Sequence, residues 1–347
     1  MNSKNNKEGA FPTAADEIAL QAYLAEALAM PLQKAQMVLE PITGGLSNPT
    51  FFLTIGGDRY VLRKQPAGKL LPSAHAIDRE FRVMDALAQT DVPVPRMVHY
   101  CDDPSVIGTP FFLMEALEGR VFHNNALPGM TSSQRHDIFA AMNQTLAALH
   151  KVDPDRVGLG DYGRKGGFIA RQVARWQGQY EKGKTRDVPE IPRLGAWLAE
   201  NLPQAETTTI AHGDFRLGNL MFHPEKPEVI GVLDWELSTL GDPLSDLGYN
   251  LMPWIMQQSE YHGLVGHDLA ALGIPSLKAY VAEYFSRRGI SASFNPYYTA
   301  FAFFRLAVIF EGIVSRAQQG NQTPSAVQDL DKYSLIFARH GLTLAGA

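Results

Sequence analysis

The stretch that decides the fold is "IAHGDFRLGNLMFH", residues 210–223, which places a histidine, an aspartate and an asparagine in one short segment. His212 and Asp214 are separated by one glycine, and Asn219 follows Asp214 by five residues. Apolar runs on both sides predict a polar loop between two buried strands. The next apolar run, "VIGVLDWE", carries Asp234 near its end, so Asp214, Asn219 and Asp234 can meet at one edge of a small β region.

These residue types suit one kind of chemistry. Asp and Asn oxygens are hard ligands for Mg²⁺, which commonly binds through one or two protein groups plus substrate phosphates. A carboxylate that is not on the metal can accept a proton from a hydroxyl nucleophile. Phosphoryl transfer uses this division of labour. The loop alone leaves a plainer interpretation open, with Asp214 as a cap and Asn219 as a turn residue. His212 is predicted to be a structural support of the loop.

Length and composition set the outer limits. A chain of 347 residues exceeds one ordinary core and predicts two packed units. The net charge of −5 gives no reason to expect a nucleic-acid partner. A single cysteine, Cys101, excludes an internal disulfide. The polar N-terminus lacks a signal-peptide core, and the apolar run 300–310 is short and contains Arg305, so we expect a cytoplasmic protein that does not enter membranes. The sequence does not indicate an oligomeric state.

The first part of the chain predicts a small sheet of about five strands with one helix against it. Strands are expected at 35–42, 50–57, 59–65, 97–100 and 111–117, with a leading helix at 14–30 and a second helix at 74–90. Beyond Gly119 the pattern becomes mostly helical, with helices expected near 132–152, 167–182, 276–288, 296–319 and 324–340. Only 208–214, 219–223 and 228–236 interrupt it as strands. The predicted fold class is α+β, with a sheet-containing part at 1–117 and a mainly helical part at 118–347.

A loop of small residues joins the first two strands of the predicted sheet. Small residues allow backbone N–H groups to approach phosphate oxygens. A plain hairpin turn explains the same residues equally well. The residues that would contact phosphates in this loop are Gly44, Gly45, Ser47 and Asn48.

Glu80 lies on the apolar stripe of the helix at 74–90, although an ionised carboxylate turned toward a sheet is costly unless it is paired. The candidate partners are Arg63 and Lys64 at the end of "YVLRKQ". Such a pair would hold a cation over nucleotide phosphates. The alternative is a half-exposed Glu80 paired with Arg79 or Arg82.

At this point the sequence resembles the aminoglycoside phosphotransferase and choline kinase superfamily, relatives of the protein kinases. Within it, the chain is most similar to the branch fused to acyl-CoA dehydrogenases. The likeness rests on "YVLRKQPAGKLLPSAHAIDREFRVMDAL", "HGDFRLGNLMF" and "VLDWELSTLGDPLSDLGYNL", and extends from about residue 35 over nearly the whole remaining chain. The resemblance implies a bilobal protein-kinase-like fold with a small antiparallel-sheet N-lobe and a larger helical C-lobe. It also implies a kinase that uses ATP and Mg²⁺ on a small-molecule hydroxyl. The family resemblance further implies that the part at 1–117 binds the nucleotide and that the part at 118–347 carries the catalytic loop and the acceptor site.

The resemblance also implies residue roles. Asp214 would be the catalytic base or orient the hydroxyl, and Arg216 would contact phosphate, although a surface arginine is equally compatible. The remaining roles are Asn219 and Asp234 on Mg²⁺, Glu80 beside the strand cation, Asp246 as a brace of the catalytic loop, and backbone groups from Glu115 to Leu117 facing adenine.

The chain departs from the kinase pattern in several places. The family's strand lysine aligns with Arg63, and Lys64 follows on the opposite face of the strand. Arginine keeps its charge, so phosphate binding remains possible with a different geometry. The glycine loop is not G-x-G-x-x-G, and the metal motif reads Asp-Trp-Glu from Asp234. The absence of an A-P-E segment argues against protein substrates.

Residues 164–186 form a basic segment in a net-acidic chain, which suggests an anionic acceptor. A solvated helix face is the alternative. The charge disfavours a polycationic aminoglycoside, whereas the resemblance implies a hydroxyacyl (CoA) thioester or similar acyl acceptor. Arg305 could meet a carboxylate or be a core arginine. The basic residues of the segment are Arg164, Lys165, Arg171, Arg175, Lys182, Lys184 and Arg186, against Glu181 alone.

Two other functions compete with a small-molecule kinase. One is an ATP-binding regulatory module with little turnover, motivated by Arg63 and the altered glycine loop. The other is a metal-dependent hydrolase that uses His212, Asp214, His223 and Asp234, which leaves Glu80 and Asn219 unexplained.

Overall fold

The computed structural model describes residues 11–42, 48–68, 76–318 and 330–347. The chain forms two compact units, one made of 1–89 and 94–118 and the other of 90–93 and 119–347. The break at Glu118–Gly119 falls where the pattern changes from β-rich to helical. The expected glycine-loop residues Gly44, Gly45 and Ser47 lie outside the described residues.

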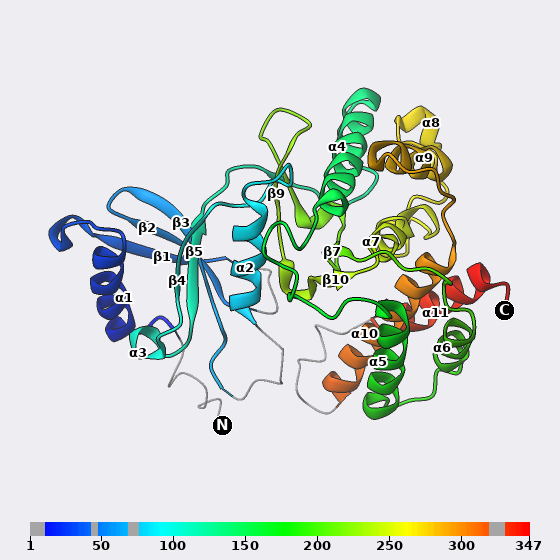
Figure 1. Ribbon diagram of the computed structural model, residues 1–347, viewed down its shortest axis with the longest axis horizontal. Coiled ribbons are helices and arrows are strands. Elements are labelled where there is room, and N and C mark those ends of the chain that lie inside the picture. Colours follow the sequence, from blue (N-terminus) through cyan, green and yellow to red (C-terminus); the bar gives the residue numbers. More distant parts are fainter. Residues whose placement is uncertain (1–10, 43–47, 69–75, 319–329) are drawn as a thin grey trace, which may run out of the picture. The chain divides into compact units, whose positions relative to one another are not determined.

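The N-terminal unit is built on a five-stranded antiparallel sheet, in the order β1-β2-β3-β5-β4 (Figure 1). The strands alternate buried and partly exposed residues, as the sequence pattern predicts. Their bounds are β1 Met37–Pro41, β2 Thr50–Ile55, β3 Asp58–Lys64, β4 Met97–Cys101 and β5 Phe111–Glu115. The predicted sheet is therefore confirmed.

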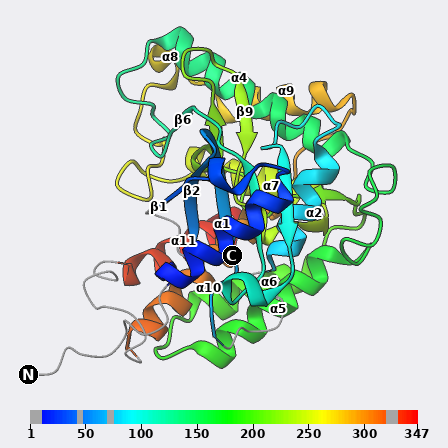
Figure 2. The same cartoon turned by 90° about the vertical axis from the view of Figure 1, so that its left-hand side faces the viewer.

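Helices cover both faces of this sheet. Helix α1, Ala14–Ala27, and the short α3, Pro104–Ile107, pack on one face through Leu20, Leu24 and Ile107. Figure 2 shows α1 lying across the strands. Helix α2, Ile77–Leu87, lies on the other face, where Phe81 contacts the ring of Phe112. Because side chains alternate along a strand, each side chain of β3 meets either α1 and α3 or α2.

The C-terminal unit is mainly helical, as predicted. Its helices are α4 Ser132–Lys151, α5 Phe168–Gly183, α6 Glu190–Glu200, α7 Pro243–Asn250, α8 Leu269–Leu272, α9 Leu277–Arg288, α10 Tyr297–Gln318 and α11 Asp331–Ala345. Helices α6 and α7 were not expected. Helix α7 begins after Asp242 with Pro243 at its first turn, and its "PLSDLGYN" composition reads as a turn rather than as a helix.

Two small sheets carry the central loops of this unit. One pairs β7, Thr209–Ala211, with β10, Thr239–Gly241. The other has the order β6-β8-β9, from Arg120–Val121, Leu220–Phe222 and Val229–Val232. The expected loop 212–219 thus runs from β7 into β8.

Helix α10 is the main core element of the C-terminal unit, and Asn295 caps it by accepting the Tyr297 N–H. Its apolar composition follows from this position. By length and composition Tyr297–Ala317 could cross a membrane, but 78% of the tested window is buried inside the protein. A core helix of a water-soluble protein passes the same test.

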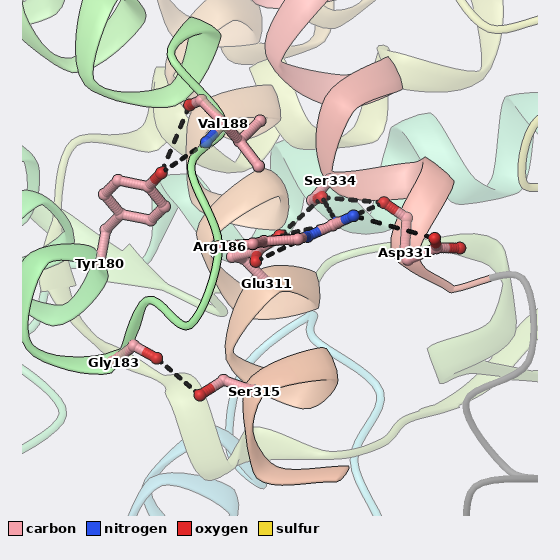
Figure 3. A network of polar contacts seen from close by, with 8 residues as sticks. All are labelled: Tyr180, Gly183, Arg186, Val188, Glu311, Ser315, Asp331 and Ser334. Atoms are coloured by element: carbon pink, nitrogen blue, oxygen red, sulfur yellow. Dashed lines mark hydrogen bonds and ion pairs between the residues drawn. The ribbon is translucent and has the colours of Figure 1, made fainter. Parts of the chain in front are cut away.

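A buried ion pair ties the segment after α5 to α10 and α11 (Figure 3). The Arg186 Nε lies 2.9 Å from Glu311 Oε1, and a terminal nitrogen lies 2.9 Å from Oε2. Ser334 of α11 donates to the same carboxylate. The Glu311 side chain is only 2% exposed, so Arg186 is committed to this contact.

We predict that Arg186→Met lowers the free energy of unfolding by about 3 kcal/mol, because it leaves a buried carboxylate without its cation. Lys184→Met is the matched control. Its pair with Glu181 is solvent-exposed and should contribute less than about 1 kcal/mol. Urea unfolding at neutral pH measures both. Equal losses in the two variants would contradict the assignment.

Candidate functional site

The loop after β7 brings the predicted residues of the C-terminal unit together. The Asn219 side-chain nitrogen lies 2.7 Å from Asp214 Oδ2 and 2.8 Å from the Asp214 carbonyl oxygen. A carboxylate and a carbonyl can only accept here, so the amide must present its NH₂ group to Asp214. Its oxygen is therefore turned away from Asp214 and remains available as a ligand.

Asp234 joins the same site through the backbone. The preceding residue, Leu233, donates its N–H to the Asn219 carbonyl at 2.8 Å. Asp234 itself has φ +64° and ψ +65°, a left-handed conformation that aspartate tolerates better than most residues. Such backbone positions concentrate at functional sites. The structure thus places Asp234 beside the Asn219 segment at the end of β9.

Arg216 follows Asp214 and stays beside it. Its Nε lies 3.4 Å from Asp214 Oδ2, and the side chains are 37% and 19% exposed. Burial lowers the pKa of Arg216, but Asp214 together with Tyr249 and Tyr261 more than offsets this, so the pKa is raised overall. The loop therefore presents a carboxylate and a guanidinium together at a partly exposed point.

His212 holds this loop in place through hydrogen bonds of both ring nitrogens. It is fully buried, and its Nε2 lies 2.9 Å from the Leu233 carbonyl while Nδ1 accepts the Asp214 N–H at 3.2 Å. Because Nδ1 accepts and Nε2 donates, the ring is neutral with its proton on Nε2. Neither nitrogen is free for a metal, which counts against the hydrolase interpretation. Among the described residues no group of three or more His, Cys, Asp or Glu side chains is arranged to hold a metal.

Asp246 of α7 holds the backbone on which His212 and Asp214 sit. Its two carboxylate oxygens accept the N–H groups of His212, at 2.6 Å, and Gly213, at 2.9 Å. His150 of α4 approaches the same carboxylate at 3.4 Å. Burial alone would raise the pKa of Asp246, but these partners lower it below its ordinary value. Burial lowers the pKa of His150, so the pair is a carboxylate and a neutral imidazole.

Sequence reasoning missed most of the contribution of α7. Asn250 donates to the Phe215 carbonyl at 3.4 Å, and Tyr249 approaches the Asp214 carboxylate, which helps to raise the pKa of this buried tyrosine. Residues 246, 249 and 250 share one helix face by the i, i+3, i+4 rule. These three residues all lie in "SDLGYN", but their common face can be recognised only once the segment is known to be helical.

In the N-terminal unit, Glu80 pairs with Arg63, as expected from its apolar surroundings. The Arg63 Nε lies 3.0 Å from Glu80 Oε2, and Glu80 is only 2% exposed. Asn48 donates to the other carboxylate oxygen at 2.7 Å. Asn48 thus ties the residues directly before β2 to α2. Glu115 closes β5, its side chain accepts the Arg96 N–H, and Leu117 follows in the connector.

Lys64 points to the other face of the sheet. It is 4% exposed, its Nζ lies 3.3 Å from the Ile107 carbonyl and 4.2 Å from the centre of the Phe11 ring. Burial lowers its pKa. This position does not favour the phosphate contact predicted for Lys64, and it leaves Arg63 as the cation on the α2 side.

Fewer basic side chains of the segment 164–186 are available to an anionic ligand than its composition suggests. Lys165 pairs with Asp155, Lys184 with Glu181, and Arg186 with Glu311. Arg171 donates to the backbone carbonyls of 164 and 166. Arg175 and Lys182 have no carboxylate partner within 4 Å among the described residues, so only part of the predicted charge remains for an anionic group.

Comparison with known proteins agrees with this architecture. Residues 38–286 match the model of the phosphotransferase enzyme family, APH. A candidate aminoglycoside phosphotransferase from Ralstonia eutropha, solved by crystallography, is 42% identical, has a TM-score of 0.87, and is aligned over 95% of this chain and 98% of its own. A crystal structure of the aminoglycoside phosphotransferase APH(4)-Ia, in a complex with AMP-PNP and hygromycin B, shares the fold at 16% identity and a TM-score of 0.59, over 93% of this chain and 98% of its own.

The predicted likeness to proteins named for acyl-CoA dehydrogenases is also confirmed. Mouse acyl-CoA dehydrogenase family member 10 is 44% identical over 297 residues, which is 85% of this chain and 28% of that protein. The chain thus spans less than a third of this relative. Together, the family match over 38–286, the antiparallel sheet with its helical partner unit and the Asp214–Asn219–Asp234 loop show that the chain belongs to the APH phosphotransferase enzyme family.

Proposed function

We propose that this chain transfers the γ-phosphoryl group of ATP, with Mg²⁺, to a hydroxyl group of a small molecule. The observation that carries the proposal is the 2.7 Å contact between the Asn219 amide and the Asp214 carboxylate. This contact would let one loop carry two functions, acceptor binding by Asp214 and metal binding by Asn219. Asp214 faces the incoming hydroxyl, while the Asn219 amide oxygen, turned the other way, is free to face a metal.

The donor set suits Mg²⁺. Asn219 and Asp234 would supply one amide and one carboxylate oxygen, and this cation usually takes its other ligands from water and substrate phosphates. When bound, Mg²⁺ supplies positive charge that stabilises the phosphoryl oxygens. The hydrogen bond from His212 to the Leu233 carbonyl would fix the spacing between Leu233 and the loop. The oxygen donors of Asn219 and Asp234 would therefore keep their relative positions when the metal binds.

Asp214 would accept the hydroxyl proton, or hold the hydroxyl in line with the phosphoryl group. The neighbouring Arg216 guanidinium would meet the transferred phosphoryl oxygens, because it lies at the same exposed point as Asp214. In the N-terminal unit, Glu80 keeps the Arg63 guanidinium in one orientation, which suits a cation that contacts the donor's phosphates. Backbone groups between Glu115 and Leu117 would contact adenine.

We predict that Asp214→Asn reduces phosphoryl transfer at least about 100-fold, because an amide cannot take the hydroxyl proton. Binding of Mg·ATP should stay within about threefold of the parent chain, since Asp214 is not assigned to the donor. The assay combines the purified chain, Mg·ATP and a metabolite extract, with phosphorylated products identified by mass spectrometry. Calorimetry measures ATP binding.

Asp85→Asn, on the exposed side of α2, is the matched control and should keep the parent rate. An active Asp214→Asn protein would remove Asp214 from the mechanism. A parent chain that binds Mg·ATP but yields no product would support the competing function, an ATP-binding regulatory module.

For the acceptor, we propose a hydroxyacyl thioester of coenzyme A. Two observations support an anionic acyl compound over an aminoglycoside. The relatives include acyl-CoA dehydrogenase family members, and Arg175 and Lys182 of α5 have no carboxylate partner in the part of the chain that the structure describes. A hollow of ≈ 200 Å³ beside the Arg186–Glu311 pair is lined by Lys182 and Arg316, among others.

We predict that hydroxyacyl-CoA thioesters are phosphorylated with at least about tenfold higher kcat/KM than the same hydroxyacyl groups on pantetheine, because only the former carry the phosphates that basic side chains attract. A panel that varies the hydroxyl position, with kanamycin as the polycationic comparator, measures this. Equal rates for both thioesters would remove the anionic tail from recognition, and faster turnover of kanamycin would overturn the acyl acceptor.

A further inference from the structure

Arg305 is a half-buried cation in the middle of α10. One of its terminal nitrogens donates to the Gly213 carbonyl, directly before Asp214. In the part of the chain that the structure describes, its Nε is shielded from solvent and has no hydrogen-bond acceptor, and no carboxylate lies within ion-pair distance. Shielding part of a guanidinium from solvent without an anionic partner is costly, so the position calls for an explanation.

The guanidinium of Arg305 also covers the ring of Tyr249. Its central carbon lies 4.8 Å from the ring centre, a cation–π arrangement that contributes more when it is desolvated. Tyr249 is only 7% exposed, and its side chain interacts with the Asp214 carboxylate. Arg305 therefore reaches the catalytic loop twice, once directly through Gly213 and once through Tyr249.

Helix packing makes this arrangement possible at one glycine. A Cβ atom on Gly248 would lie 2.5 Å from the Tyr298 carbonyl carbon and 2.8 Å from the Thr299 nitrogen, so any side chain there would separate α7 from α10. The close approach lets Tyr249, the next residue of α7, lie under Arg305, two turns further along α10. The close approach of the two helix backbones thus sets the distance that the Arg305 side chain spans.

We infer that Arg305 and Tyr249 are positioning residues that jointly fix Asp214 for the acceptor hydroxyl. Arg305 restrains the backbone before Asp214 through the Gly213 carbonyl. Tyr249 restrains the Asp214 carboxylate, and the cation over its ring keeps the ring in place. The inference rests on the proposed function, in which Asp214 meets the acceptor. It assigns a function to two residues to which the family resemblance gave no role.

Full-length variants test the inference. Arg305→Met keeps an unbranched apolar stem but removes the guanidinium, and with it the contacts to the Gly213 carbonyl and the Tyr249 ring. Tyr249→Phe removes only the hydroxyl. We expect kcat to fall about 100-fold in Arg305→Met, because small misplacements of a catalytic group are costly. We expect about a tenfold fall in Tyr249→Phe, with KM for ATP within about twofold in both. Arg305→Lys should recover part of the loss, since an ammonium can reach Gly213 but stacks less well.

The double variant provides a second readout. Because both residues act on one loop, the combined loss of Arg305→Met/Tyr249→Phe should be clearly smaller than the product of the single losses. Arg193→Met, at an exposed position on α6, is the matched control and should equal the parent chain. Rates within threefold of the parent, or a fully multiplicative double variant, would overturn the inference.

Amide hydrogen exchange separates failure of this inference from failure of the proposed function. We expect residues 212–216 to exchange at least about tenfold faster in Arg305→Met than in Arg193→Met, whether or not an acceptor is turned over. An unchanged exchange rate would show that Arg305 does not hold the loop. If the parent chain shows no phosphoryl transfer but Arg305→Met still exchanges faster, the restraint by Arg305 is supported and the proposed kinase activity is rejected.

Discussion

The site depends on one contact, the carboxylate of Asp246 holding the two consecutive N–H groups of His212 and Gly213. A loop that leaves a strand must satisfy its backbone donors somewhere, and here a single buried carboxylate on α7 satisfies two of them. The same segment then turns through Gly213, at φ +85°, where a Cβ would come within 2.6 Å of the Leu237 carbonyl oxygen. The turn directs Asp214 outward while His212 stays in the core.

From this anchor the loop is restrained on every side by a different element. His212 reaches Leu233 after β9, Asn219 closes back on Asp214, and α7 adds contacts from Tyr249 and Asn250. Arg305 of α10 adds the contact to Gly213. Such a loop needs little reorganisation when a substrate binds, which is how protein dipoles and charges become effective in catalysis. The cost is a set of buried polar groups, each of which must keep its partner.

Strand β3 shows how adjacent residues acquire unrelated roles. Arg63 and Lys64 are both basic and both largely buried, yet alternation along the strand sends them to opposite faces. Arg63 meets Glu80 on α2, whereas Lys64 lies among α1 and α3 residues. The sequence suggested both as phosphate contacts. The pairing of Glu80 with a strand cation was predictable from the cost of a buried carboxylate, but the choice between the two cations required the register of the sheet.

The sequence by itself determined the elements whose cause is local. Apolar alternation defined the five strands, the 3.6-residue period defined the long helices, and the order of the polar motifs indicated the family. The tertiary structure decided α7, the partners of the basic segment and the contacts of Arg305. Helix α7 is short and rich in turn-forming residues, so its helical form depends on its tertiary contacts, among them the close packing on α10 at Gly248. Within 164–186, Arg186 is paired with Glu311, which lies far away in the sequence, whereas Lys165 and Lys184 pair with nearby acids. A period or a motif records what a segment prefers, whereas the pairing of distant charges depends on which helices pack together.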